Sequence, residues 1–139
     1  LERLHVMNLW PMELGGRQRS ENAPEGWPGT VHPLLKQHPR TGDPILYVNA
    51  NHSDRIIELP SEESESLILE MFERLYDPAN CYEHRWCNGD LVVWDNLALQ
   101  HSRKKVPPGV PRTLQRVEIG TADYMELMPP ALKSAYGIG

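Results

Sequence analysis

The segment that follows Pro60 carries the clearest structural pattern in the chain. Its apolar side chains recur at the three- and four-residue spacing of one face of an α-helix. These side chains are Leu67, Ile68, Met71, Phe72 and Leu75. Ser61 is a residue type that favours the N-cap, and glutamates place negative charge in the first turn, where the helix dipole is positive. We therefore expect an amphipathic helix over residues 62–76.

Short β-type runs lie on both sides of this predicted helix. The turn-type sequence "RTGD" separates residues 31–37 from residues 44–49, which predicts a hairpin whose prolines favour an edge position. Three later runs, "CYEHRWC", "DLVVWD" and "RTLQRVEI", are short, rich in β-branched or aromatic residues, and bounded by turn residues. We therefore expect a mainly β fold with flanking helices.

The N-terminal segment has weaker patterns. Residues 1–12 carry apolar groups at a spacing mostly compatible with a short helix that ends at Pro11. Residues 13–30 are rich in Gly, Pro and polar residues and have no period, so we expect a mobile loop that acts as a lid or a linker. The chain starts at Leu1 rather than Met, which indicates that a segment upstream has been removed or is not included.

Length, charge and cysteine content narrow the class of protein. The 139 residues suit a single domain, and no apolar run is as long as a membrane-spanning helix, so we expect no membrane partner. The net charge of -5, with no basic block beyond "RKK", argues against nucleic acid as a partner. Cys81 and Cys87 lack CxxC spacing, which is typical of reduced thiols in a cytoplasmic protein.

The tract "WDNLALQH", residues 94–101, contains a candidate metal ligand. A neutral imidazole at His101 suits Fe, Zn, Cu or Ni, although a lone histidine is more often a packed or surface residue. With His52 and Asp54 of "HSD", His101 would compose a two-histidine, one-carboxylate facial triad of the Fe(II) type. The alternative is that His52 and Asp54 lie in a polar connection before the predicted helix.

Two arginines share a face of the last predicted strand. Strand alternation places Arg112 and Arg116 on the same side, with Cα atoms about 13 Å apart at the usual rise per residue. Guanidinium groups bind carboxylates, phosphates and sulfonates through paired hydrogen bonds, so this face can hold anionic ligands or buried ion pairs. On spacing alone, a solvated face is the preferred interpretation.

A series of motifs in fixed order points to a family. In sequence they are "VHP", "HPRTGDPILYVN", "RII.L", "SEESESL", "RW..GD", "WDN....H" and "PR...R". Over residues 30–119 this order resembles the C-terminal half of the taurine dioxygenase family of Fe(II)- and 2-oxoglutarate-dependent oxygenases. The resemblance implies a double-stranded β-helix, a jelly roll with helices outside its two sheets, of which this chain would be the C-terminal portion of a larger domain.

The resemblance also implies roles for individual residues. His101 matches the family's distal iron ligand, Arg112 matches the arginine that holds the far carboxylate of 2-oxoglutarate, and Arg116 matches the arginine that meets the substrate's acidic group. The family's other metal ligands form a His-x-Asp pair far upstream, so the resemblance does not make His52 and Asp54 ligands. It assigns no residue a catalytic role.

Other positions are expected to be structural or to affect the substrate. Leu97 and Leu99 stand where the family usually has Arg and Thr, and "GTADYM" replaces the usual "GD.P". The resemblance implies that Trp94 and Asn96 line or support the site and that Asp95 has a structural role behind the site or at the strand end, and we expect none of the three to be catalytic. The remaining histidines and both cysteines are expected to be structural or surface residues, namely His5, His32, His38, His84, Cys81 and Cys87.

Two hypotheses about function follow. The resemblance implies a dioxygenase that hydroxylates a small anionic substrate (a sulfonate, sulfate ester or carboxylate) with dioxygen and converts 2-oxoglutarate to succinate and CO2. The alternative is a non-catalytic remnant of such an enzyme, stabilised by self-association through open sheet edges, so we also expect a homo-oligomer.

Overall fold

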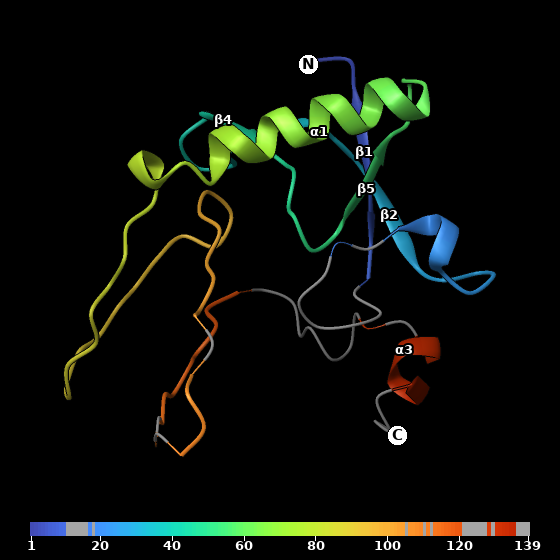
Figure 1. The fold of residues 1–139 in the computed structure, drawn as a ribbon. Coiled ribbons are helices and arrows are strands. Elements are labelled where there is room, and N and C mark those ends of the chain that lie inside the picture. The colour runs from blue at the N-terminus through green and yellow to red at the C-terminus, as the bar shows by residue number, and fades with distance from the viewer. Residues whose placement is uncertain are drawn as a thin grey trace. The chain divides into compact units, whose positions relative to one another are not determined.

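The computed structural model describes residues 1–10, 17, 19–104, 106–109, 111, 113–120, 128 and 130–135. The chain divides into two compact units, Leu1–Gln100 and His101–Gly139. The strands found among the described residues, and the long helix, lie in the first unit (Figure 1).

A three-stranded antiparallel sheet contains the N-terminal strand at its centre. The strands are β1 (His5–Leu9), β2 (Gly29–Pro33) and β5 (Ser53–Ile56), in the order β2-β1-β5. In the register, Val6 lies opposite His32 on one side and Ile56 on the other.

The predicted helix over residues 1–12 is therefore wrong. Val6 and Leu9 are three residues apart and both are buried, a spacing that a short helix would also produce. Pairing with a strand on each side satisfies the backbone of β1, and this pairing depends on residues far along the chain.

A hairpin lies between β2 and β5 in the sequence. β3 (Leu35–Gln37) pairs antiparallel with β4 (Pro44–Leu46), which confirms the predicted hairpin. The predicted strand 31–37 is divided at Leu34, whose backbone N–H donates to the Leu4 carbonyl while its own carbonyl accepts from the Tyr47 N–H, both at 2.8 Å. Leu34 thus links the hairpin to the start of the chain.

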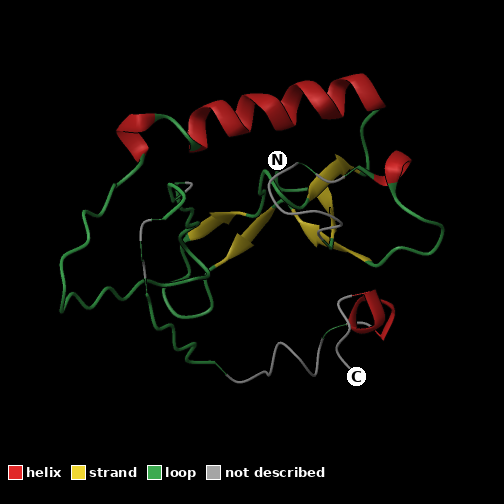
Figure 2. Ribbon diagram, turned by 60° about the horizontal axis from the view of Figure 1, so that its bottom comes forward, coloured by secondary structure: helices red, strands yellow, loops and turns green. Residues whose placement is uncertain are grey.

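Helix α1 (Ser61–Leu75) confirms the predicted amphipathic helix to within one residue at each end. Ser61 is not the N-cap, because that position belongs to Pro60, which has no side chain able to accept a hydrogen bond. The hydroxyl of Ser64 instead accepts a hydrogen bond of 2.8 Å from the Ile56 N–H and ties the first turn to β5. Figure 2 shows α1 lying on one side of the strands.

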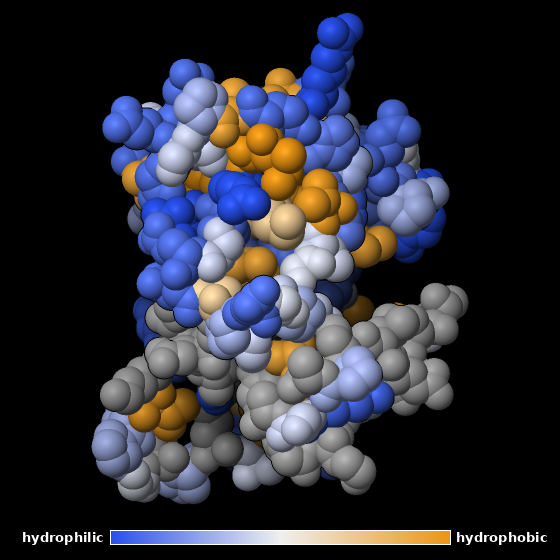
Figure 3. Space-filling model, turned by 90° about the vertical axis from the view of Figure 1, so that its right-hand side faces the viewer, coloured by the Kyte–Doolittle hydropathy of each residue, from blue (hydrophilic) through white to orange (hydrophobic). Residues whose placement is uncertain are grey.

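The core of the first unit lies between α1 and the strands. Its buried members are Val6, Leu34, Val48, Ile56, Ile68 and Met71. On the face seen in Figure 3, hydrophobic side chains gather in the upper middle and are flanked by hydrophilic ones. No helix in the described part of the chain is long and apolar enough to cross a membrane.

Replacing Ile56 by Val should lower stability measurably. Ile56 is fully buried, so loss of one methylene should reduce the free energy of unfolding by about 0.5–1.5 kcal/mol. Ile57→Val is the matched control, because Ile57 is 42% exposed and the same change there should cost less than about 0.5 kcal/mol. Urea denaturation at neutral pH measures both, and equal losses at the two positions would contradict the assigned core.

The three predicted strands after residue 80 are wrong for the described residues. None of the described residues in 81–120 belongs to a strand. The small antiparallel sheets of the described residues are compatible with a fragment of the predicted jelly roll and do not confirm it. Leu91 and Val93 are 87% and 80% exposed, and Ile119 is 98% exposed. A β-type run becomes a strand only when a neighbouring backbone pairs with it, and side-chain propensity does not supply that partner.

The second unit contains one described helix, α3 (Pro130–Ala135). Pro130 occupies its first position. Proline is well tolerated there, because the first backbone N–H groups of a helix have no partner within the helix.

Candidate functional site

His101, the predicted iron ligand, opens the second unit. Its neighbour Gln100 ends the first unit. Among the residues that the structure describes, no three His, Cys, Asp or Glu side chains come together in a group that could hold a metal ion. The His101 imidazole fits iron as one donor, while the described residues do not form a complete metal site.

Of the two predicted anion-binding arginines, Arg116 is among the residues that the structure describes. Arg112, the predicted 2-oxoglutarate residue, lies outside the described residues. The Nη2 atom of Arg116 lies 2.6 Å from Oε1 of Glu118, with both side chains more than 60% exposed. An exposed pair of this kind stabilises a fold by about 1 kcal/mol or less. Breaking the ion pair between Arg116 and Glu118 therefore costs little free energy.

His52 and Asp54 have partners within the first unit. The Nδ1 atom of His52 lies 3.1 Å from the Leu9 carbonyl oxygen. Asp54 is buried within β5, and its Oδ1 accepts a hydrogen bond of 3.0 Å from the Ser20 N–H. The predicted connection is thus partly a strand, and these contacts give both residues structural roles.

Asp95 joins the "WDN" tract to the β3–β4 hairpin. Its Oδ2 lies 3.0 Å from Nε2 of His38 and 2.6 Å from Nη2 of Arg40, and its Oδ1 accepts from the Leu97 N–H. Nδ1 of His38 accepts from the Arg40 and Thr41 N–H groups, so a neutral ring carries its proton on Nε2 and donates it to Asp95.

The role of His38 could not be found from the sequence. His38 was expected to be structural or at the surface, and it is a buried residue, only 5% exposed. Its partner Asp95 lies 57 residues away, a separation that carries no local periodic signal. The contact becomes visible only when the hairpin and the "WDN" tract are placed in space.

The stabilisation contributed by Asp95 should depend on pH. The Leu97 N–H, the His38 ring and the Arg40 guanidinium hold the pKa of Asp95 below its usual value of 3.8. Because the folded-state pKa is depressed, this stabilisation is complete above about 3.8 and is lost as the pH falls through the folded-state value. Asp95→Asn should therefore lower the denaturation midpoint at pH 7, and its difference from the wild type should shrink as the pH falls below 3.8.

The control for this measurement is Asp43→Asn, at an exposed aspartate of the same hairpin. Asp43→Asn should change the midpoint little at either pH. A stability difference between Asp95→Asn and wild type that stays constant from pH 7 to pH 3 would contradict the assigned contacts of the carboxylate.

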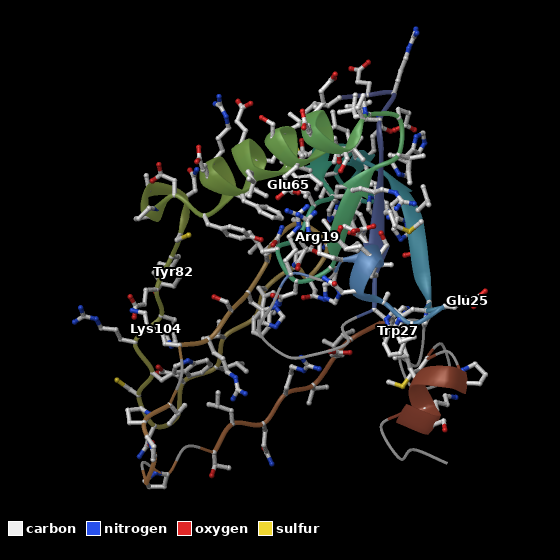
Figure 4. All side chains as sticks on the ribbon, turned by 45° about the vertical axis from the view of Figure 1, so that its right-hand side comes forward. Arg19, Glu25, Trp27, Glu65, Tyr82 and Lys104 are labelled. Carbon is white, nitrogen blue, oxygen red and sulfur yellow. The ribbon has the colours of Figure 1, made fainter. Side chains whose placement is uncertain are left out.

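The described part of the predicted lid, residues 13–30, is attached to α1 and β5. Arg19 and Arg17 lie 2.7 and 2.8 Å from the Glu65 carboxylate, and Arg17 also donates to the backbone carbonyls of Ser53 and Asp54 (Figure 4). Burial would raise the pKa of Glu65, but the two arginines outweigh it and hold the pKa below its usual value. The mobility of this segment stays a prediction.

Comparison with known families identifies the chain. The model "Taurine catabolism dioxygenase TauD, TfdA family" matches residues 1–117, and the chain belongs to this family. The predicted resemblance is confirmed, and the match extends it to residues 1–29. It includes the positions of His101, Arg112 and Arg116.

Three proteins of known activity illustrate the similarity. Pentalenolactone F synthase of Streptomyces avermitilis is 36% identical over 95 residues, 68% of this chain and 31% of that protein. The alpha-ketoglutarate-dependent 2,4-dichlorophenoxyacetate dioxygenase of a Burkholderia species is 32% identical over 103 residues, 74% and 34% of the two chains. The alpha-ketoglutarate-dependent sulfonate dioxygenase of Saccharomyces cerevisiae is 35% identical over 105 residues, 73% and 25% of the two chains.

The matched region is a minor part of each of these proteins. The chain spans about a third of the length of the curated relatives it matches first. No solved structure matches the chain significantly.

Proposed function

We propose that this chain is part of an Fe(II)- and 2-oxoglutarate-dependent dioxygenase that hydroxylates a small anionic substrate and releases succinate and CO2. The observation that carries the proposal is the family match over residues 1–117, which includes His101, five positions after the Asn of "WDN", and two arginines farther along the chain. Iron with 2-oxoglutarate would supply the activation of dioxygen.

Three residues of this chain have roles in the proposal. His101 donates one imidazole to the iron. Arg112 pairs with the far carboxylate of 2-oxoglutarate, for which a guanidinium has the matching two-pronged geometry. Arg116 binds the acidic group of the substrate, and its exposed pairing with Glu118 can be exchanged for that group at small cost.

The remaining parts of the site lie elsewhere in the proposed enzyme. The chain covers about a third of its first relatives, and we place the two missing iron ligands in the portion it does not include. An anionic substrate is supported by two relatives, whose names specify 2,4-dichlorophenoxyacetate and a sulfonate. Leu97 and Leu99, which replace Arg and Thr of the family pattern, make the substrate differ from those of typical members.

A second candidate is a non-catalytic remnant stabilised by self-association. The observation that favours it is the exposure of Leu91, Val93 and Ile119, since pairing between copies would cover such side chains. A homo-oligomer is compatible with both candidates. We also propose a cytoplasmic location, supported by the two cysteines, which are free and exposed in the structure.

Two measurements on the natural protein separate the candidates. Mass spectrometry of the intact polypeptide should give a mass well above the 15.9 kDa of this chain if the enzyme is complete. Succinate formation should then require Fe(II), 2-oxoglutarate and one member of a panel of sulfonates, sulfate esters and aryloxyacetates. A 15.9 kDa product that forms no succinate with any of them would support the remnant.

A further inference from the structure

Among the described strands, β5 forms one edge of the three-stranded sheet, beside β1 (Figure 1). In the register of these two strands, Met7 lies opposite Arg55. The next residue of β1, Asn8, lies opposite Ser53, so Asp54 is the extra residue of a β-bulge. A bulge interrupts the alternation of the ladder, and here the carbonyls of Ser53 and Asp54 both accept hydrogen bonds from the same side chain.

That side chain is Arg17, whose guanidinium spans the distance from the sheet edge to α1. Its Nε donates a hydrogen bond of 2.9 Å to the Ser53 carbonyl, and its Nη2 donates one of 2.8 Å to the Asp54 carbonyl. Its Nη1 lies 2.8 and 2.9 Å from the two carboxylate oxygens of Glu65. The guanidinium carbon also lies 5.5 Å from the centre of the Phe72 ring. All three guanidinium nitrogens are thus engaged, and Glu65 holds the group in place.

Two backbone N–H groups of β5 are also engaged within the first unit. The Ile56 N–H donates a hydrogen bond of 2.8 Å to the Ser64 hydroxyl, and the Ser53 N–H donates one of 2.9 Å to the Asn49 carbonyl. Ser64 is 2% exposed, so another chain reaches the Ile56 N–H only if α1 moves. The two carbonyls bound by Arg17 are different, because only one side chain, 17% exposed, has to leave before they become accessible.

We propose that Arg17 guards the outer edge of β5 and prevents the same strand of a second copy from pairing with it. The N–H and C=O groups of an edge strand are a template for a further strand, and charged side chains on the edge are one way in which proteins block it. When the guard is lost, a second copy is the partner, because antiparallel pairing of β5 with itself places donors of each copy opposite acceptors of the other. This inference does not depend on the proposed function, and it excludes the β5 edge as the contact of the proposed homo-oligomer.

The test replaces Arg17 in the complete protein. Arg17→Met keeps a long apolar side chain and removes the guanidinium. Sedimentation velocity at several protein concentrations should show self-association at least about 10-fold tighter than in the wild type, because two carbonyls lose a charged donor. Hydrogen exchange should show that protection of β5 rises with protein concentration in this variant only. Arg17→Lys keeps the charge without the planar fork that spans both carbonyls and Glu65, and it should give an intermediate result.

Two controls separate the guard from loss of charge and from loss of stability. Arg74→Met is the same change at an exposed arginine of α1 that pairs with Glu70, and it should leave self-association unchanged. Ser64→Ala removes the hydroxyl that accepts from β5 and should lower the unfolding temperature, but it leaves Arg17 in place and should not tighten self-association. If Ser64→Ala associates as strongly as Arg17→Met, lower stability explains the association and the proposal is overturned.

The remaining outcomes of Arg17→Met are also decisive. A folded variant with the same self-association as the wild type overturns the proposal. So does association accompanied by loss of exchange protection in β1, since this loss indicates aggregation of an unfolded chain. If Arg17→Met does not fold, Glu65→Gln takes its place, because it keeps the guanidinium and removes the carboxylate that holds it. Glu65→Gln should tighten self-association by a smaller factor, and a value equal to that of the wild type overturns the proposal.

Discussion

Replacing His101 by Ala in the complete protein should weaken Fe(II) binding by more than about 100-fold and abolish succinate formation. Loss of a residue that only orients a ligand costs up to about 100-fold in metal affinity, and loss of the ligand itself should cost more. Anaerobic titration with Fe(II) measures the first effect, and succinate release in the presence of 2-oxoglutarate measures the second.

The control for this prediction is His52→Ala. His52 lies beside the Leu9 carbonyl oxygen in the first unit and would be an iron ligand only in the alternative triad with Asp54. The variant should bind Fe(II) with wild-type affinity. The reverse pattern, with affinity lost in His52→Ala and kept in His101→Ala, would make "HSD" the metal motif and refute the family assignment of His101.

Replacing Arg112 and Arg116 one at a time should separate cofactor binding from substrate binding. Arg112→Ala should weaken 2-oxoglutarate binding by about 2–5 kcal/mol and leave substrate affinity nearly unchanged, because a charge-assisted pair in a partly dry site is lost. Arg116→Ala should show the opposite pattern. Titration of each variant, first with 2-oxoglutarate and then with a sulfonate or aryloxyacetate that the wild type converts, measures the two affinities.

The competing explanation for Arg116 is a structural pair with Glu118. It predicts that Arg116→Ala lowers stability slightly and changes both affinities equally or not at all, since an exposed pair contributes about 1 kcal/mol or less. Glu118→Gln is the matched control, because it breaks the same pair and keeps the arginine. If Glu118→Gln loses as much substrate affinity as Arg116→Ala, the binding role of Arg116 is wrong.

The elements that the sequence predicted correctly are those that depend on near neighbours. Helix α1 follows from apolar spacing within 15 residues, and the β3–β4 hairpin follows from a turn sequence between two short runs. β1 was predicted as a helix because its two buried residues, Val6 and Leu9, stand three positions apart, as on one face of a helix, and its real partners lie far along the chain.

In the candidate site, too, residues that belong to a local motif were predicted, and contacts between residues far apart in the sequence were not. His101 and Arg116 were selected by motif order, and the family match includes both positions. The polar contacts of Asp95 with His38, and of Gln100 with Val48 and Tyr76, join residues 24 to 57 positions apart. No spacing rule connects such residues, so hydrogen bonds between them are found only from coordinates.

The position of β1 between β2 and β5 has a consequence for the order in which the first unit folds. The β3–β4 hairpin closes a loop of a few residues, so it can form as soon as Leu46 is available. The pairing of Val6 with Ile56 closes a far longer loop, which costs more chain entropy. The contacts between β1 and β5 offset this cost only after the two strands have paired. β1 leaves the ribosome well before β5 and therefore waits for it before the three-stranded sheet is finished, and its apolar residues stay accessible to chaperones in the meantime.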